Sequence, residues 1–588
     1  MSRAGRVAAA LSGLGAAALV AGGLALGAVA APSAAPGGGQ RNAAVEVPVP
    51  ASGAQLVCPG APVPVTGAEG GVRRGSTPST TSAASSATGL VLASGAPALT
   101  GTTLLQRPSA AADASTPTSA ASSSASSSSS ASASSSAPGA STAKALGDLQ
   151  RVEADPSAAS AGAATSLAAG PVDGRAPLLA GAATSVTTSG DLRGLSTPAC
   201  AAPQEQTWLV GGGTGVGRST RLVLADAAQT PTTVDVTVLT ATGAQQPSAL
   251  QGLSLGPGEQ RSVLLEGVLE SVVDSASAGG AASTSGAPLA VQVRSSAGPV
   301  ASWLVESVLH GLVPGGTEVV GPAAAPATSL VVPGIAATGS QPAVLRLANP
   351  GTDPVVARFA VVGASGASVP AGTAPATAVP PQSVVDVPLP GLPSGGVALS
   401  VQADGPVLAG VRTDTAPTGD GTQPGDLAWT AATPPLSGPT LVALPPAARQ
   451  GRQGSLTTPD VRLVLSSRGA SQVDVAVVGA DGRASAARRV ELPASTTTAA
   501  DVDDLARTAG AQGSPVALLL TPVAPAQPSG QTSGQTSGRD ADGAGQVVAA
   551  LTARVPAPAG GGGDLVSAAP VGGGAAAPSS VAVTLSGP

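Results

Sequence analysis

The chain has 588 residues and a formal net charge of −6, with only 10% charged residues and 43% hydrophobic ones. This length exceeds what one hydrophobic core supports, so we expect several domains of about 100–200 residues each. The 79 glycines and 55 prolines indicate many turns, and the hydrophobic content is high enough to argue against disorder throughout. The small negative charge argues against nucleic acid as a partner, because no basic face is present to neutralise phosphates.

The N-terminus has the pattern of an export signal. Arg3 and Arg6 precede an apolar run over residues 7–31, and Ala28-Val29-Ala30 supplies the small residues that signal peptidase recognises. The run is also long enough to span a bilayer, so residues 1–31 are either a cleaved signal peptide or a retained N-terminal membrane anchor. Both alternatives predict an exported protein.

Three later segments, residues 222–243, 345–366 and 463–482, repeat one pattern of strand, polar turn, Val-rich strand and small-residue turn. The offsets are 345 − 222 = 123 and 463 − 345 = 118 residues. A period of this length is a whole small domain per repeat, unlike the roughly 20–50 residues of a solenoid or propeller repeat. In the middle copy, Asn349-Pro350-Gly351 predicts a turn in which the asparagine side chain bonds its own backbone.

Each copy continues with further strands and turns. Residues 289–306 and 397–412 are predicted to be hairpins, the first turning at Ala297-Gly298-Pro299 and the second at Asp404-Gly405-Pro406. Next, each copy has a short glycine-containing motif, Gly-Gly or Pro-Gly, that ends in an acidic residue. These residues are Glu318, Asp426 and Asp564 in the three copies. Seven or eight short strands in roughly 120 residues is the strand complement of an immunoglobulin-like sandwich.

Residues 55–206 contain similar landmarks in the same order and are interpreted as a fourth, degraded copy. Residues 56–60 (LVCPG) parallel residues 330–334 (LVVPG), and Gly190-Asp191-Leu192 parallels Gly425-Asp426-Leu427. Between these landmarks, residues 109–143 consist mostly of Ser, Ala and Thr, which bury too little apolar area to order themselves. The alternative is chance similarity between stretches that are all rich in Ala, Gly and Val.

The sequence therefore predicts an all-β fold of tandem immunoglobulin-like β-sandwich modules, with a flexible Ser/Ala-rich insertion in the first. No long helical pattern is found after residue 31. The predicted division assigns residues 1–31 to the signal peptide or membrane anchor, 32–54 to a linker, 55–206 to the degenerate module with the low-complexity insertion 109–143, 207–328 and 329–439 to two further modules, and 440–588 to a last module with a polar insertion at 527–545.

Cys58 and Cys200 are the only two cysteines. In an exported protein an isolated pair forms a disulfide more often than a metal or redox site, and this pair brackets the first module. The bond closes a loop of roughly 140 residues. It would stabilise the module by about 4–5 kcal/mol through the entropy of the unfolded chain, less any strain. The alternative is two unpaired, buried thiols.

Two features resemble nucleotide-binding or catalytic patterns but lack a required part. Residues 212–219 (GGTGVGRS) approach the phosphate-binding pattern G-x-x-x-x-G-K-[ST], yet Arg218 stands in place of the lysine and a strand is predicted to follow instead of a helix. A glycine-rich connection is the preferred interpretation. His310, the only histidine, has no G-x-S-x-G nucleophile elbow to pair with and is interpreted as a solvated loop residue.

Asp501, Asp503 and Asp504 stand close together in the sequence and are a candidate metal site. Their oxygens suit Ca²⁺, but no glycine turn and terminal glutamate follow at loop spacing, so a solvated acidic turn is preferred. Zinc sites of the three-histidine or Cys/His kind are excluded by the count of histidines and cysteines.

The three tryptophans, Trp208, Trp303 and Trp429, are either platforms for sugars or core residues. The apolar runs around Trp208 and Trp429 favour the core. We therefore predict no catalytic residue, no cofactor and no metal site.

Short motifs spread over the chain carry a family resemblance. They are residues 56–60 (LVCPG), Cys200 followed by residues 208–213 (WLVGGG), residues 332–335 (VPGI) and residues 345–351 (LRLANPG). In them the chain resembles an uncharacterised family of exported cell-envelope proteins from high-GC Gram-positive bacteria, known only as a domain of unknown function. The resemblance covers most of the chain beyond the leader and implies an envelope location and no catalytic residue. Two departures are the sequence LADAAQTP in place of an Asn-Pro-Gly turn in the second module, and the long Ser-rich insertion.

We expect a non-enzymatic protein, secreted or tethered at the outer face of the cytoplasmic membrane, whose tandem sandwiches serve as scaffold or interaction modules. The expected partner is an envelope protein or a wall glycan. The alternative function is a cell-wall carbohydrate-binding protein, and an enzyme of unrecognised type comes third. Exposed tryptophans gathered on one face would favour glycan binding, whereas buried ones would favour the scaffold.

Overall fold

The computed structural model describes residues 45–48, 52–64, 83–92, 99–106, 140–142, 144–146, 149–154, 162–172, 175–269, 287–337, 343–370, 372–393, 395–415, 423–449, 456–523, 546–557, 561–572 and 580–583. The predicted signal peptide or anchor, the insertion at 527–545 and nearly all of the insertion at 109–143 lie outside these residues. Within the described ranges, no helix is both long and apolar enough to cross a membrane.

The chain divides into two compact units. The smaller contains Met1–Val49 and Ser580–Pro588, and the larger contains Pro50–Ser579. In the smaller unit, β1 (Val45–Pro48) pairs antiparallel with β39 (Ser580–Val583).

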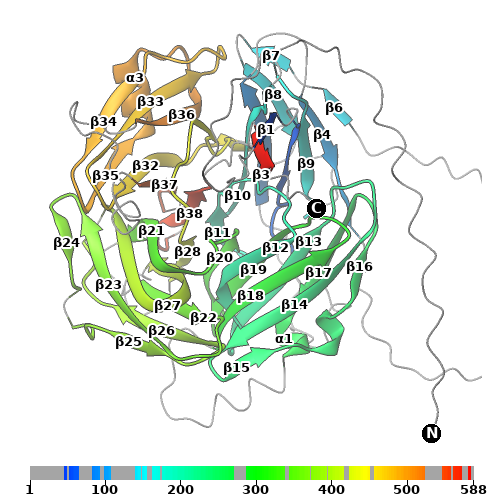
Figure 1. The fold of residues 1–588 in the computed structure, drawn as a ribbon, viewed down its shortest axis with the longest axis vertical. Helices are drawn as coiled ribbons and strands as arrows, with labels where there is room; N and C mark the ends of the chain where they lie inside the picture. Colours follow the sequence, from blue (N-terminus) through cyan, green and yellow to red (C-terminus); the bar gives the residue numbers. More distant parts are fainter. Residues whose placement is uncertain are drawn as a thin grey trace, which may run out of the picture. The chain divides into compact units, whose positions relative to one another are not determined.

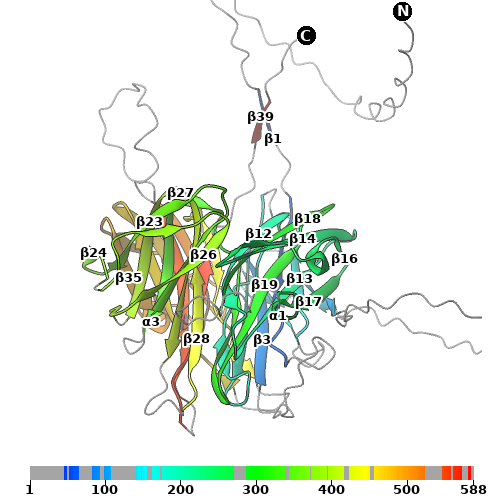
Figure 2. The same ribbon diagram turned by 90° about the horizontal axis from the view of Figure 1, so that it is seen from below.

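The larger unit is built almost wholly of strands, whose sheets face one another in pairs (Figure 1). This confirms the predicted all-β class of tandem β-sandwich modules, while the immunoglobulin-like assignment stays a prediction. We name the four sandwiches modules one to four in chain order. Their long strands lie roughly along one axis, with paired neighbours running in opposite directions (Figure 2).

Module one holds the disulfide between its two sheets. One sheet contains β2 (Ala54–Cys58), β9 (Thr165–Ala169), β4 (Leu99–Thr103) and β6 (Ala140–Thr142); the other contains β11 (Gly194–Ser196), β10 (Leu178–Thr187), β3 (Ala83–Leu92), β8 (Leu149–Ala154) and β7 (Lys144–Leu146). The Cys58–Cys200 disulfide joins β2 to the segment after β11 and lies in the module's core. Gly181 faces it, and a Cβ there would lie only 2.6 Å from Cys200 Sγ, so this position needs glycine.

Module two packs two sheets around a core of Leu and Val side chains. One sheet contains β12 (Gln206–Gly213), β18 (Pro288–Ser296), β14 (Thr232–Thr240), β15 (Gly243–Gln245) and β16 (Leu253–Leu255); the other contains β20 (Val313–Val320), β19 (Ala301–His310), β13 (Arg218–Ala225), β17 (Glu259–Leu264) and the short β5 (Leu105–Gln106) from module one. Two one-turn helices, η1 (Ser248–Leu250) and α1 (Leu265–Val268), follow strands of this module.

Module three is organised around one long strand, β27 (Gly395–Thr415), which takes part in both sheets. One sheet contains β26 (Ser383–Leu389), β22 (Ala343–Asn349), the second half of β27 and β28 (Asp426–Ala431); it is continuous with the β14 sheet of module two, because β14 pairs with β26 at Thr240 and Ser383. The other contains β21 (Ala327–Ala337), the first half of β27, β23 (Val355–Gly363), β24 (Gly366–Ser368) and β25 (Thr377–Val379).

Module four adds the longest helix of the described residues, α3 (Val502–Ala509). One sheet contains β29 (Thr440–Ala443), β36 (Pro515–Val523), β33 (Ser471–Gly479) and β34 (Arg488–Leu492); the other contains β35 (Thr496–Asp501), β32 (Asp460–Ser467), β37 (Val547–Val555) and β38 (Leu565–Val571). The helix begins because the Asp501 carboxylate accepts the N–H groups of Asp503 and Asp504, and it ends at Gly510 with φ 67°. The solvated acidic turn predicted here is therefore the first turn of a helix.

The strand pairs predicted as hairpins at 289–306 and 397–412 cross between the two sheets of their module instead. β18 pairs with β12 and β14, whereas β19 pairs with β13 and β20 in the opposite sheet. β27 runs on through Asp404 and Gly405, changing its partners from β21 and β23 to β22 and β28. A turn sequence marks a change of direction but does not choose the partner, and sandwich strands switch sheets at such bends.

Each module has its own core, and hydrophobic clusters join the modules in a closed cycle. Module four also lends β30 (Ala448–Arg449) and β31 (Leu456–Thr457) to the sheet of module one that contains β3. The clusters contain Val57 and Trp303 between modules one and two, Trp208 and Leu408 between two and three, Val331 and Val548 between three and four, and Leu441 and Leu90 between four and one. Figure 1 shows the resulting arrangement around a common centre.

The polar turn after the first strand of the repeat is held by a buried side chain. In module three, Asn349 Nδ2 donates to the carbonyl oxygens of Asp353 (2.7 Å) and Val379 (3.2 Å), and the Gly351 N–H donates to Asn349 Oδ1 (2.9 Å). This confirms the predicted asparagine turn.

Asp226 stands at the equivalent position of module two, 123 residues earlier. Its Oδ1 accepts the Ala228 N–H at 2.8 Å, but its buried Oδ2 has no partner among the described residues, and burial raises the pKa of this carboxyl.

We predict that Asp226→Asn stabilises the protein at pH 8, because it removes a buried charge and supplies the amide that module three uses at this position. A carboxyl whose pKa is raised by folding stabilises the fold most at low pH and loses that contribution as the pH rises. The gain should therefore be largest at pH 8 and shrink as the pH falls toward about 4, as measured by urea unfolding midpoints. Asp353→Asn, at an exposed position, is the control, and an Asp226→Asn midpoint at or below wild type at pH 8 would contradict the prediction.

Candidate functional site

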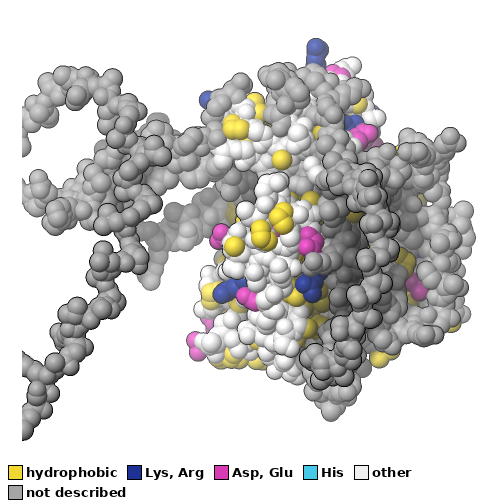
Figure 3. All heavy atoms as spheres, turned by 90° about the vertical axis from the view of Figure 1, so that its right-hand side faces the viewer, with side chains coloured by type: hydrophobic (Ala, Val, Ile, Leu, Met, Phe, Trp, Pro, Cys, Tyr) yellow, Lys and Arg dark blue, Asp and Glu magenta, His cyan; other side chains and the backbone are white. Residues whose placement is uncertain are grey.

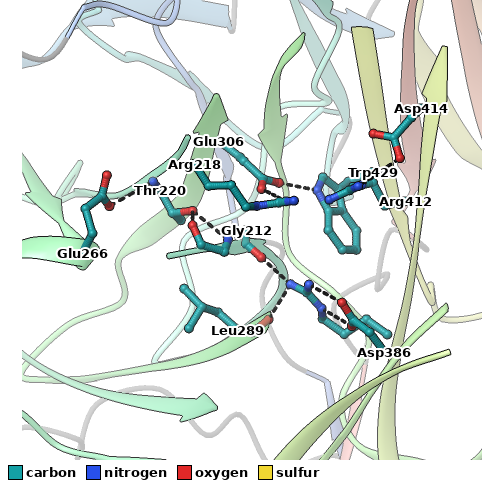
Figure 4. A network of polar contacts seen from close by, with 12 residues as sticks. Gly212, Arg218, Thr220, Glu266, Leu289, Glu306, Asp386, Arg412, Asp414 and Trp429 are labelled. Carbon is teal, nitrogen blue, oxygen red and sulfur yellow. Dashed lines mark hydrogen bonds and ion pairs between the residues drawn. The ribbon is translucent and has the colours of Figure 1, made fainter. Parts of the chain in front are cut away.

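The largest group of buried ionic side chains lies between modules two and three. We call it the arginine network; it consists of Arg218, Glu306, Arg346, Asp386, Arg412, Asp414 and Trp429 (Figure 4). Glu306 of β19 accepts a hydrogen bond from the Arg218 guanidinium of β13 and another from Trp429 Nε1 of β28, the latter at 2.6 Å. Carboxylate, guanidinium and indole are all buried, so the contacts tie β19 to its own sheet and to module three.

Arg346 of β22 satisfies its whole guanidinium within the protein. Its Nε and Nη2 donate to the two oxygens of Asp386 at 2.8 and 2.9 Å, while Nη1 donates to the carbonyl oxygens of Gly212 and Leu289 in module two. The guanidinium carbon lies 4.7 Å from the centroid of the Trp429 ring, a cation–π contact. The side chain has no exposed surface, so it acts as a buried link between the two modules.

Three arginines set the ionisation of Glu306. Burial alone would favour the neutral acid, but the charges of Arg218, Arg412 and Arg346 outweigh burial, and the pKa of the Glu306 carboxyl falls below its usual value. Arg412 in turn bonds Asp414 Oδ2 through Nε (3.1 Å) and Nη2 (3.0 Å). Each arginine of the network thus faces a carboxylate, and the buried charges are balanced.

A second group, the central network, lies where β11, β20, β28 and β38, one strand from each module, meet; it consists of Arg193, Ser196, Glu318, Asp426 and Ser567. Asp426 Oδ2 accepts the N–H groups of Leu195 (3.0 Å) and Val566 (2.9 Å), which belong to modules one and four. Asp426 Oδ1 accepts the Leu427 N–H at 2.9 Å.

Glu318 makes the matching contacts from module two. Its Oε1 accepts from the hydroxyls of Ser196 (2.8 Å) and Ser567 (3.2 Å), and Arg193 donates to the carbonyl oxygens of Gly425 and Gly563. A Cβ at Gly194 would lie 2.5 Å from the Thr317 carbonyl oxygen, so glycine is needed for this close approach of strands.

Both carboxyls of the central network favour the neutral form more than usual. Burial raises the pKa of Asp426 to about 8, although the three backbone N–H groups and Arg193 favour its ionised form. Burial also raises the pKa of Glu318 well above its usual value, and the neighbouring Asp426 adds to that effect. Glu318 Oε2 has no partner among the described residues, which fits a neutral acid better than a charge.

The structure gives the phosphate-loop candidate a structural role. Gly212, the second-last residue of β12, has φ 79°, and the Thr220 hydroxyl closes the connection by donating to the Gly213 carbonyl at 2.8 Å. Arg218, which stands where the lysine of a phosphate loop would be, points to Glu306 (Figure 4). The strand β13 follows directly, as the sequence predicted, so no helix N-terminus is present at this loop.

The other candidate residues are placed apart from one another. His310 is exposed but is the last residue of β19, so the predicted loop position is wrong. All three tryptophans are buried, at 7% exposure for Trp208, 0% for Trp303 and 2% for Trp429. Asp564, equated with Glu318 and Asp426 in the sequence, pairs with Arg554 near the surface and takes no part in the central network. Gly190–Leu192 likewise precede β11 instead of opening it.

The two networks are therefore structural in their geometry, since their polar groups contact one another or strands of a neighbouring module, and of the charged side chains in the arginine network only Asp414 is more than 6% exposed. Sequence reasoning missed both, and the only available signal was the presence of charged residues inside Val-rich strands, as at Arg346 and Glu306. Among the described residues no group of three or more His, Cys, Asp or Glu side chains could hold a metal ion.

These features define an all-β protein of four packed sandwiches with buried ionic groups at the module boundaries. The chain belongs to a family of unknown function, DUF5719, whose model matches residues 152–503. This confirms the coarser part of the resemblance, that the family is an uncharacterised domain. The match begins in β8 of module one and ends in α3 of module four, so it spans several modules instead of recurring with each one. No curated protein and no solved structure matches the chain.

We predict that Glu306→Gln destabilises the protein by about 3–5 kcal/mol, because it leaves Arg218 buried without a counter-ion. The free energy of unfolding in urea should show the loss, followed by the fluorescence of the buried tryptophans. Asp474→Asn is the matched control: it breaks the exposed ion pair with Arg489 and should leave the midpoint nearly unchanged. Equal midpoints for Glu306→Gln and wild type would refute the structural role of the network.

A second prediction concerns pH. Because folding raises the pKa values of Glu318 and Asp426, their contribution to stability is complete below about pH 4 and is lost as the pH rises toward and beyond 8. Glu318→Gln keeps a neutral side chain at all pH values, so the thermal midpoint should fall less steeply between pH 6 and pH 9 than that of wild type. Asp564→Asn, at the equivalent motif outside the network, should leave the slope unchanged. A slope unaffected by Glu318→Gln would be the contrary result.

Proposed function

We propose that the protein is a non-enzymatic scaffold of the cell envelope, exported and either released or tethered at the outer face of the cytoplasmic membrane. Its four sandwiches would present a rigid surface to an envelope protein or a wall glycan. The observation that carries this proposal is the position of the polar and aromatic side chains. The charged groups of both networks and all three tryptophans lie at module boundaries or in cores, where they hold the fold together.

The residue inventory supports a structural role over catalysis. Catalytic groups must reach a substrate, and the strongly perturbed carboxyls, Glu318 and Asp426, are fully buried with their oxygens facing other strands. The one histidine is exposed at the end of the β19–β20 hairpin and is a member of neither network. The pKa values of Glu306, Glu318 and Asp426 are shifted by burial and ion pairing between modules. Such shifts occur in structural networks as well as in active sites, so they do not by themselves indicate catalysis.

Export is supported by two features. The charged start and apolar run of residues 1–31 fit a signal peptide or anchor. The disulfide within module one fits an oxidising compartment outside the cytoplasm. The resemblance to envelope proteins of high-GC Gram-positive bacteria agrees with this location.

The surface fits a partner other than nucleic acid. On the face drawn in Figure 3, the Lys and Arg side chains stand singly among white polar and backbone atoms and form no continuous basic area. The alternative of carbohydrate binding loses its expected aromatic platform, because sugars stack on exposed rings and the three tryptophans are buried.

The test uses a strain that lacks the gene and carries variants of the full chain. If surface and spacing provide the function, variants with one exposed Asp or Glu changed to Ala should complement the deletion strain. A variant that lacks residues 329–439 should fail to complement, because the deletion breaks the cycle of modules. The measurements are growth under envelope stress and the amount of protein in culture medium and membrane fractions.

Three outcomes would overturn the proposal. A single exposed carboxylate variant that is exported normally, melts normally and fails to complement would indicate an enzyme. Failure to complement in a variant that has lost only saturable binding to wall glycan would favour the carbohydrate-binding alternative. Recovery of the protein in the cytoplasm alone would contradict the location.

A further inference from the structure

Module four contains an open cleft that the scaffold role does not use. It has a volume of about 360 Å³ and is lined by Arg462 of β32, Arg488 of β34, Ala499, Ala500 and Asp501 of β35, and Asp504, Leu505 and Thr508 of α3. This size falls within the roughly 300–1,000 Å³ of small-molecule sites. The elements that form it lie together in Figure 1, where α3 follows β35 directly.

The carboxylates of the cleft already have partners. Asp501 Oδ1 accepts the N–H groups of Asp503 (3.0 Å) and Asp504 (3.3 Å) at the start of α3. Asp504 forms an ion pair with Arg507 one turn along the helix. One oxygen of each carboxylate is therefore engaged by the helix, and the two aspartates and two arginines of the cleft balance in charge.

The arginines of the cleft have unused hydrogen-bond donors. Among the described residues no hydrogen bond or ion pair engages Arg462, although Asp501 stands opposite it in the β32–β35 ladder. Arg488 makes one long bond, from Nη1 to the Thr508 hydroxyl at 3.4 Å. By contrast its neighbour Arg489 forms a two-bond ion pair with Asp474, at 2.8 and 2.9 Å. Two guanidinium groups with free donors in one cleft suit a planar anion.

We propose that this cleft binds a small hydroxylated carboxylic acid, with the chemistry of an acidic sugar. The guanidinium groups of Arg462 and Arg488 hold the carboxylate. The remaining oxygens of Asp501, Asp504 and Thr508 accept the ligand's hydroxyls, and the Leu505 side chain forms an apolar wall. The site is independent of the scaffold role, because its residues take no part in either network.

The experiment titrates the purified full-length protein with sodium D-glucuronate by isothermal calorimetry at low salt. Glucuronate should bind, and D-glucose, which has the hydroxyls but no carboxylate, should bind at least tenfold more weakly. Arg462→Ala and Arg488→Ala should each weaken glucuronate binding at least tenfold. Arg489→Ala, which removes the paired neighbour, and Arg483→Ala, in a nearby exposed turn, should leave the affinity unchanged.

Arg462→Lys and Arg488→Lys keep the charge but lose the planar pair of donors, so they should give intermediate affinities. Thermal unfolding of each variant shows whether it is folded, and these exposed positions should leave the midpoint near that of wild type. Four results would each overturn the proposal. They are equal affinity for glucose and glucuronate, unchanged affinity in both alanine variants, tighter binding of glucose 6-phosphate, and no heat of binding at glucuronate concentrations up to about 50 mM. None of these outcomes bears on complementation by the scaffold.

Discussion

One carboxylate, that of Asp426, holds backbone N–H groups from three strands that belong to three modules. A buried carboxyl group without such donors would cost several kcal/mol, so its position requires that β11, β28 and β38 meet at one place. Glu318 adds the fourth strand through the hydroxyls of Ser196 and Ser567. The arrangement of the four sandwiches therefore depends on a few polar contacts whose geometry permits little variation, whereas the hydrophobic clusters around them tolerate more.

Much of the fold could be predicted because it depends on patterns of neighbouring residues in the sequence. Strand periodicity and a repeat of about 120 residues predicted β-sandwich modules, and Asn349 predicted the turn that it forms. The errors arose where the outcome depends on distant partners. The turns near Ala297 and Gly405 were recognised, but whether the next strand returns to the same sheet or crosses to the other depends on the whole sandwich. The helix α3 was missed because it is only 8 residues long and its capping residue, Asp501, resembles any acidic turn.

The networks could not be predicted for the same reason. Arg218 and Glu306 are 88 residues apart in sequence, and neither belongs to a motif that names the other. Asp426 and Asp564 stand in nearly identical motifs, yet one lies in the protein centre and the other pairs with Arg554 near the surface. The two carboxylates meet different partners, and the local sequence does not specify which partners they meet. The tryptophans were easier, because the apolar runs around Trp208 and Trp429 already indicated burial.

The closed cycle of modules has a consequence for how such a chain can change its copy number. In an open solenoid, a duplicated or deleted repeat leaves end surfaces that resemble the old ones, so arrays lengthen and shorten readily. Here each boundary uses its own side chains, with Trp303 at one, Trp208 at the next and Leu441 at the last. A fifth sandwich would find no matching neighbours, and a lost one would bring two unrelated surfaces together. The four boundaries, each with its own contacts, therefore fix the number of sandwiches at four.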